Sequence, residues 1–127
     1  MSQSARRFAD LAAIIHVFTG DGTGGKGDIW GDDTKPLCEA AMRRILASPG
    51  NTLFVAGHAG MVIGTIQVTL IPGLVARGRT RAKLESIHVR PEHRSFGIGA
   101  MMVRQALDFA RSQGAGIAEL TSHTLRP

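Results

Sequence analysis

Apolar residues recur at helical spacing in three segments of the chain, with polar positions between them. In the first segment, one face at i, i+3, i+4 and i+7 is formed by Leu11, Ile14, Ile15 and Phe18. The second follows a capping residue, Asp33 or Thr34, and its apolar stripe contains Leu37, Cys38, Ala41, Met42, Ile45 and Leu46. The third begins after Ser95, and its apolar side contains Ile98, Met102, Ala106 and Phe109. We therefore expect three amphipathic helices.

Shorter runs between these segments are rich in residues that favour strands. Residues 52–56 and 61–71 are such runs, and the glycine-bearing segment 57–60 between them predicts a hairpin. Further strands are expected at 84–89 and 117–121. Because the third helix connects these last two strands, they should be parallel neighbours. The order predicts an α/β layered fold, with residues 1–127 forming a single domain.

The segment 84–114 runs as a strand, a glycine-bearing turn and a helix. The first N–H groups of a helix have no intrahelical partner, and the helix dipole adds a partial positive charge there. Gly97 and Gly99 would let an anion approach the backbone without a Cβ in the way, and Arg94 adds a guanidinium group. The sequence therefore predicts an anion site at the start of this helix.

These residues resemble motif A of the GNAT acyltransferase superfamily. Its signature, Gln/Arg-x-x-Gly-x-Gly/Ala, is present as Arg94-x-x-Gly97-x-Gly99, directly after a Val-x-Pro-Glu-x-Arg segment that begins at Val89. The resemblance covers roughly residues 8–121. It implies a GNAT-like acyl-CoA N-acyltransferase fold, with a mixed, mostly antiparallel sheet and helices on both faces. The implied activity is transfer of an acetyl group from acetyl-CoA to a primary amine of a small molecule or protein.

The resemblance also implies where acetyl-CoA would bind. In this family the two strands that flank the motif splay apart, and pantetheine pairs with the exposed edge of the first. The backbone that would meet pantetheine belongs to Ile87, His88 and Val89. The residues that would hold the pyrophosphate are Arg94, Ser95, Phe96, Gly97, Ile98, Gly99 and Ala100.

Acetyl transfer to an amine needs a general base near the amine and donors that stabilise an oxyanion. Glu85 lies near the expected splay and shares strand parity with Ile87 and Val89, so we name it as the candidate base. An ion pair with Lys83 or a neighbouring arginine is the competing interpretation. His88, expected on the opposite face, is a weaker candidate. We assign no residue as a metal ligand.

A glycine-rich segment, residues 19–33, separates the first two helical patterns. Its Gly20-x-x-x-x-Gly25-Lys26 run nearly matches a P-loop, but Gly27 replaces the magnesium-binding Ser/Thr and a helix precedes it, so we reject nucleotide hydrolysis. In GNAT proteins this connection lines the acceptor site. Trp30 is therefore a candidate substrate contact, and a lid over the core edge is the alternative.

The sequence departs from the family pattern after residue 121. GNAT proteins usually continue with a further helix and two strands, which often carry a tyrosine that protonates the departing thiolate. The chain ends at Pro127 and contains no tyrosine. We therefore expect a C-terminally truncated fold, and His123 is a candidate to reach the thioester sulfur. An apolar edge at 117–121 predicts a homodimer.

Composition leaves two other functions open. The formal net charge of +5 and the basic cluster at 77–83 allow a small nucleic-acid-binding domain, although an aromatic content of 5% gives base stacking little support. A non-catalytic coenzyme A-binding module is the other alternative. The single cysteine, Cys38, fits a reducing cytoplasm. The sequence contains no apolar run long enough to predict a membrane span. We expect a cytoplasmic protein with neither membrane nor nucleic-acid partners.

Overall fold

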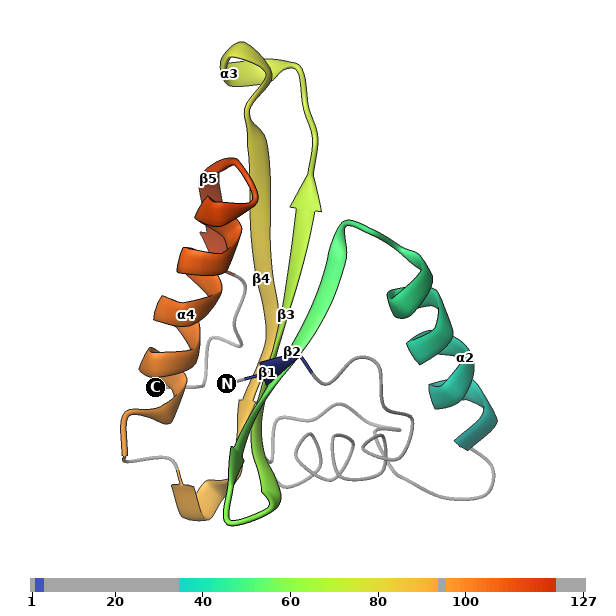
Figure 1. The fold of residues 1–127 in the computed structure, drawn as a ribbon, viewed down its shortest axis with the longest axis vertical. Helices are drawn as coiled ribbons and strands as arrows, with labels where there is room; N and C mark the ends of the chain where they lie inside the picture. The colour runs from blue at the N-terminus through green and yellow to red at the C-terminus, as the bar shows by residue number, and fades with distance from the viewer. Residues whose placement is uncertain (1, 4–34, 94–95, 121–127) are drawn as a thin grey trace.

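The computed structural model describes residues 2–3, 35–93 and 96–120. These residues form a sheet with one long helix on either side (Figure 1). The strands are β1 (Ser2–Gln3), β2 (Asn51–His58), β3 (Met61–Ile71), β4 (Thr80–Val89) and β5 (Ala115–Leu120). The helices are α2 (Lys35–Ala47), the short α3 (Val75–Gly78), the 3-10 turn η2 (Pro91–His93) and α4 (Ile98–Ser112). The predicted first helix and the 19–33 segment lie outside the described residues.

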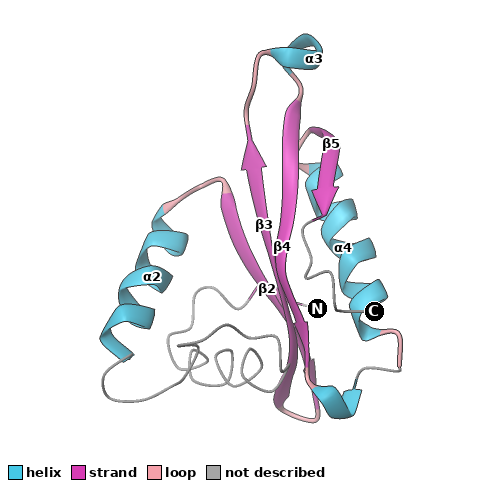
Figure 2. Cartoon of the chain, turned by 180° about the vertical axis from the view of Figure 1, so that it is seen from behind, coloured by secondary structure: helices cyan, strands magenta, loops and turns pink. Residues whose placement is uncertain are grey.

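The described sheet has its strands in chain order, β1-β2-β3-β4-β5. Each neighbouring pair from β1 to β4 is antiparallel, whereas β4 and β5 are parallel and are connected through α4. This confirms the predicted mixed, mostly antiparallel sheet, and Figure 2 shows from behind that α2 and α4 flank it on opposite sides. The strand–helix–strand unit places the start of α4 just beyond the end of β4.

The face of the sheet under α4 carries the main core. Its buried residues are Phe54, Ala56, Ile63, Ile66, Val68, Ala82, Leu84, Met102, Ala106 and Ala110. Met102 and Ala106 are buried as predicted, but Ile98 and Phe109 are only partly buried, whereas Ala110, expected at the margin of the apolar stripe, is fully buried. Phe109 packs edge-on against Phe54, with ring centroids 4.9 Å apart. The buried stripe is therefore rotated slightly from the one we predicted.

A glycine in β3 sets how closely α4 approaches the sheet. A Cβ at Gly64 would lie 2.9 Å from the Sδ of Met102 and 3.3 Å from the carbonyl oxygen of His88. Only a residue without a side chain leaves room for Met102, which is fully buried above it. The helix that follows the glycine motif is thus packed tightly onto β3.

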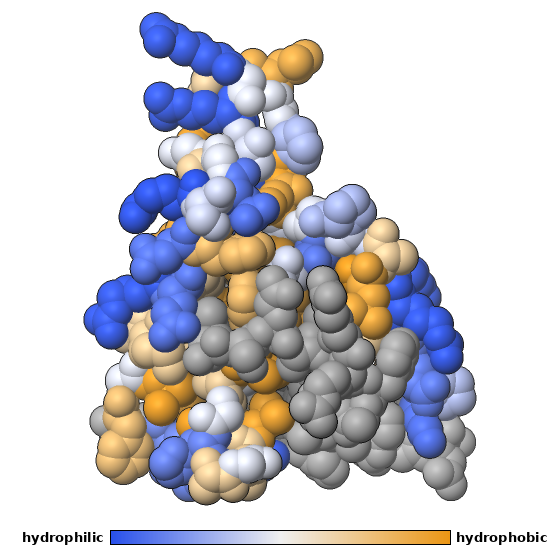
Figure 3. All heavy atoms as spheres, in the orientation of Figure 1, coloured by the Kyte–Doolittle hydropathy of each residue, from blue (hydrophilic) through white to orange (hydrophobic). Residues whose placement is uncertain are grey.

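The opposite face has a smaller apolar cluster beneath α2. Its buried members are Met42, Leu53 and Val55, with Cys38, Ile45 and Val62 partly buried around them. Leu37 and Leu46, which the sequence placed in the apolar stripe, are exposed. Figure 3 shows hydrophilic side chains along the outer surfaces of both α2 and α4, as expected for amphipathic helices at a surface.

Strands β3 and β4 extend into an arm that ends at α3 (Figure 1). At its tip Leu74 is 96% exposed, and Ala76 and Arg77 adopt positive φ angles of 52° and 63°. The predicted exposed connection at 77–81 is shorter than expected, because β4 already begins at Thr80 and Arg81 pairs with both β3 and β5.

Candidate functional site

The start of α4 has the backbone features of an anion site. Gly97 occupies the N-cap with a φ of 75°, and no side chain of the described residues caps the helix there. Glycine adopts this left-handed conformation at little cost, whereas other residues are strained in it. A Cβ at Gly97 would meet no atom of the described residues within 4 Å, so the glycine is required here by its backbone conformation and not by close packing.

The first turn of α4 is also electrostatically suited to an anion. Its N–H groups, beginning at Ile98, have no acceptor within the helix. No acidic side chain lies in this turn, so nothing within it competes for the positive end of the helix dipole. Phe96, immediately before it, is 75% exposed. This arrangement can bind a phosphate or pyrophosphate through backbone groups.

The second motif glycine lies against the end of β4. A Cβ at Gly99 would be 3.9 Å from the Cγ2 of Val89, an ordinary van der Waals contact. The structure therefore brings the end of β4 and the start of α4 together, as the motif implied. Arg94 and Ser95, and the more distant candidates Trp30 and His123, lie outside the described residues.

The end of β4 is held in place by Arg90. Its backbone N–H donates to the carbonyl of Ile63 at 2.8 Å, and its Nε donates to the carbonyl of Val62 at 2.7 Å. The sequence predicted only a break after the strand at this position. The structure shows that Arg90 bonds the end of β4 to β3 through both its backbone and its side chain. A basic residue before a proline does not indicate such a contact in the sequence.

Strand β4 contains a β-bulge beside β3. Gln67 pairs with Glu85 and Thr65 pairs with His88, so one residue of β3 lies opposite two residues of β4. Ser86, one of these two residues, has a φ of 55° although it is not glycine. Sequence reasoning missed this bulge, because a serine in a strand-like run does not signal a positive φ.

The bulge corrects the predicted orientation of the candidate base. Glu85 and His88 lie on the same face of the sheet, because their β3 partners are opposite Leu53 and Val55 of β2, which pack beneath α2. Ile87 packs instead against the core on the α4 side. The prediction that Glu85 shares parity with Ile87, and that His88 faces the other way, was therefore wrong, since the extra residue inverts the alternation.

Glu85 also has the ion-pair partner that the sequence suggested. The Nζ of Lys83 is 4.0 Å from Oε2 of Glu85, and their side chains are 39% and 34% exposed. A pair this long and this exposed contributes little to stability, so it does not fix the carboxylate in place. The Glu85 carboxylate is thus partly exposed and only loosely paired on the α2 side of the sheet.

Within the described residues, the two strands around the crossover are paired along the first part of β4. The described β4–β5 ladder ends with Leu84 opposite Leu120, whereas the pairing of β4 with β3 continues to Val89 opposite Gly64. The segment that the family resemblance assigned to pantetheine, residues 87–89, lies beyond the last described pair with β5.

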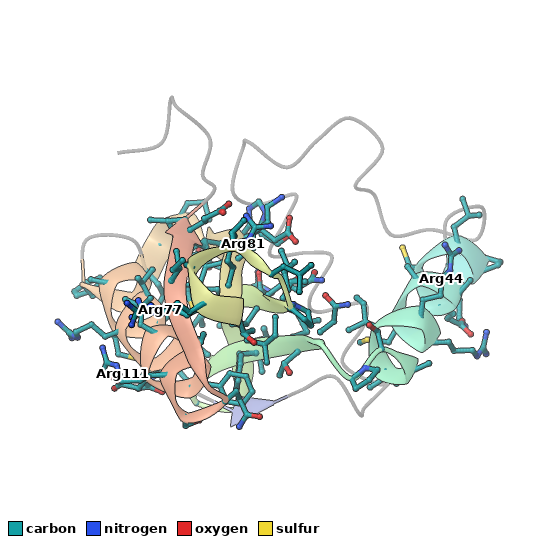
Figure 4. The ribbon with its side chains drawn as sticks, turned by 90° about the horizontal axis from the view of Figure 1, so that it is seen from above. Arg44, Arg77, Arg81 and Arg111 are labelled. Carbon is teal, nitrogen blue, oxygen red and sulfur yellow. The ribbon has the colours of Figure 1, made fainter. Side chains whose placement is uncertain are left out.

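Basic residues of the described part of the chain are distributed over several elements. Figure 4 shows that the labelled arginines come from four different elements, Arg44 on α2, Arg77 on α3, Arg81 on β4 and Arg111 on α4. Arg81 forms an ion pair of 2.6 Å with Glu119, and Arg111 lies 3.5 Å from Asp108. Internal pairing and dispersal both weaken the alternative of a nucleic-acid surface.

None of the helices in the described part of the chain has the length and apolar character needed to cross a bilayer.

Comparison with known proteins gives a consistent result. The profile of the Acetyltransferase (GNAT) family matches residues 21–126. N-alpha-acetyltransferase RimI of Mycobacterium tuberculosis is 37% identical over 110 residues, which are 84% of this chain and 56% of that protein. Streptothricin acetyltransferase of Streptomyces lavendulae is 53% identical over 36 residues, 28% of this chain and 19% of that one. The chain therefore spans about half the length of the first of these relatives, and less of the second.

Solved structures share the fold. A transcriptional regulator from Bacillus halodurans C-125 superposes with a TM-score of 0.86 at 28% identity, covering 94% of this chain and 79% of that one. A predicted acetyltransferase with acetyl-CoA from Clostridium acetobutylicum gives a TM-score of 0.73 at 15% identity, covering 94% and 79%. At the lower identity the likeness concerns the fold alone.

Proposed function

The chain belongs to the Acetyltransferase (GNAT) family, and from this premise we propose that it transfers an acetyl group from acetyl-CoA to a primary amine. The observation that carries the proposal is the junction between β4 and α4. There Gly97, in the left-handed conformation, begins a helix whose first turn contains no acidic side chain. This turn lies directly beside the end of β4, the strand that contains the bulge.

The residues present fit coenzyme A. The amide groups at the start of α4, from Ile98 to Ala100, would hold the pyrophosphate, with Arg94 and Ser95 as further contacts. The backbone of 87–89 would run beside pantetheine. When bound, acetyl-CoA supplies an acetyl thioester, whose carbonyl carbon is the electrophile.

The remaining chemistry falls to the residues around the bulge. Glu85 would accept a proton from the acceptor amine, directly or through water, so that the nitrogen attacks as a neutral nucleophile. The N–H of Ile87 lies within the bulge, outside the paired register with β3, and is our candidate for stabilising negative charge on the acetyl oxygen. His123 and Trp30 remain proposed contacts, with the thioester sulfur and the acceptor respectively.

Turnover with acetyl-CoA and a panel of amines tests this function. We expect release of free coenzyme A thiol that depends on the amine, and acetylated amine detectable by mass spectrometry. The panel should include small primary amines and peptides with free N-termini. Stoichiometric acetyl-CoA binding without turnover on any amine would favour the non-catalytic coenzyme A-binding module instead.

We further propose that the protein is a homodimer that pairs through β5. This strand is the outermost on its side of the described sheet, and its residues after Ala115 are exposed, including Leu120. An exposed edge strand is a template for pairing with a second chain. Light scattering at micromolar concentration should give twice the chain mass, and a monomer would contradict the proposal.

We also propose a cytoplasmic location, which is supported by the single cysteine of the sequence. Cell fractionation should recover the protein with cytoplasmic markers, and recovery with the membranes or in the medium would overturn this.

A further inference from the structure

Thr65 is the buried polar residue of the described core. Its exposed fraction is 0%, and it lies in the middle of β3, opposite Val55 of β2 and so on the same face of the sheet as that residue. Its hydroxyl Oγ1 donates a hydrogen bond of 3.1 Å to the backbone carbonyl of Ser86. A buried hydroxyl loses its hydrogen bonds to water, so this bond gives it the partner that burial requires.

The acceptor of this bond is the strained residue of the bulge. Ser86 has a φ of 55°, a conformation that residues with a Cβ adopt at an energetic cost. A bulge also removes its extra residue from the regular ladder, so a backbone group there needs another partner. The hydroxyl of Thr65 supplies that partner.

The same residue is tied to β4 in two ways. In the backbone register Thr65 is opposite His88, while its side chain bonds to the carbonyl of Ser86. It therefore spans the bulge and fixes where the extra residue is accommodated. The position of the bulge determines that Glu85 and His88 lie on the α2 side and that Ile87 faces the α4 core.

We propose that Thr65 is a positioning residue, which holds the Ser86 bulge and so sets the direction of the 87–89 backbone relative to Glu85. Catalysis is sensitive to such placement, because a misplaced donor or base loses most of its effect. The inference rests on the proposed acetyltransferase function for its kinetic consequence, but its structural part can be tested without turnover.

The kinetic test compares two substitutions at Thr65 with one at Thr69. Thr65→Val keeps the branched shape and removes the donor, whereas Thr65→Ser keeps the hydroxyl. Thr69→Val is the matched control, because it removes a partly buried hydroxyl on the same strand and face. That hydroxyl donates to Oδ1 of Asn51 at 2.7 Å, away from the bulge. All three should be compared by kcat and by the KM for acetyl-CoA.

We expect Thr65→Val to lower kcat by about tenfold, equivalent to about 1.4 kcal/mol, with a smaller change in KM. Thr65→Ser should retain most of the wild-type kcat, and Thr69→Val should leave it unchanged. A wild-type kcat in Thr65→Val, or equal losses in the Val and Ser variants, would show that the hydroxyl does not position the site.

A second variant guards against poor folding of Thr65→Val. In Thr65→Val/Ser86→Gly, glycine can adopt the positive φ without help, so the double variant should fold and recover part of the lost kcat. No recovery in a folded double variant would contradict the mechanism.

Amide hydrogen exchange separates this inference from the proposed function. Exchange at residues 85–89 should accelerate in Thr65→Val and not in Thr65→Ser or Thr69→Val, whether or not the protein acetylates an amine. If the wild type shows no turnover but this exchange pattern is present, the function fails and the role of Thr65 in the bulge stands. Unchanged exchange at 85–89 in Thr65→Val overturns the inference itself.

Discussion

The two faces of the sheet differ in what they contribute. The α4 face is apolar and closely packed, with Met102 fitted over Gly64. The α2 face has a smaller apolar cluster and then a row of polar and charged side chains on β3 and β4, among them Lys83 and Glu85. One face fixes the helix that begins at the glycine motif, and the other presents groups able to react. Under the proposed function, cofactor binding and proton transfer would therefore depend on opposite sides of one strand, β4.

The strongest way to test this division is to block the start of α4. Gly97→Glu introduces a side chain at a φ of 75° and a negative charge where an anion would bind, so acetyl-CoA affinity should fall by at least about 100-fold. Gly114→Glu is the matched control, since Gly114 also has a positive φ of 91° with open space, near the other end of α4. Calorimetric titration should show normal affinity for the control. Equal losses in the two variants would mean that strain, not the anion site, is responsible.

The chemistry assigned to the α2 side is tested by Glu85→Gln. We expect kcat to fall by about 100-fold, within the usual range for removing a general base, while the dissociation constant for acetyl-CoA stays unchanged. Glu119→Gln is the control, because Glu119 is also half-exposed and paired with a basic residue. Steady-state kinetics across pH provide the measurement. If Glu85→Gln retains full kcat, the base lies elsewhere.

Because the two faces of the sheet are packed differently, replacing a buried methionine by alanine should lower the free energy of unfolding by different amounts on each face. Met102→Ala, in the large core, should lower the free energy of unfolding by about 4 kcal/mol, and Met42→Ala, under α2, by about 2 kcal/mol, within the range for such changes. Both methionines are almost fully buried, so exposure does not explain the difference. Urea denaturation followed by circular dichroism measures both. Equal costs would show that the α2 cluster is packed as well as the α4 core.

The smallest effect is expected from the ion pair between β4 and β5. Arg81 and Glu119 are close, at 2.6 Å, but both side chains are more than a third exposed. A double-mutant cycle with alanine at each position should give a coupling of about 0.5 kcal/mol, decreasing with added salt. A coupling well above about 1 kcal/mol would show that this ion pair contributes more to stability than is usual for an exposed pair.

The sequence predicted the parts of the fold that depend on periodicity and on glycine. The strand at 61–71 was predicted with its observed bounds, and α2 and α4 were placed from their apolar spacing. Motif A located the candidate anion site, because Gly97 is required by the backbone conformation there. These features depend on local preferences, which a single sequence reveals.

The features that the sequence could not predict depend on contacts between strands. The bulge at Ser86 depends on a hydroxyl from a neighbouring strand, 21 positions earlier in the chain, and no local pattern indicates it. The predicted orientation of Glu85 was wrong because this bulge changes which face of the sheet the following residues lie on. The buried stripe of α4 was slightly misplaced, because Gly64 lets Met102 approach more closely than helix periodicity alone can indicate.

The most direct test of the central claim is a calorimetric titration of the wild-type chain with acetyl-CoA. The account predicts one site per chain with micromolar affinity, since the junction between β4 and α4 supplies the anion site through its own backbone. Absence of binding by a chain shown to be folded by circular dichroism would contradict it, because the candidate site would then be present in structure without holding the cofactor.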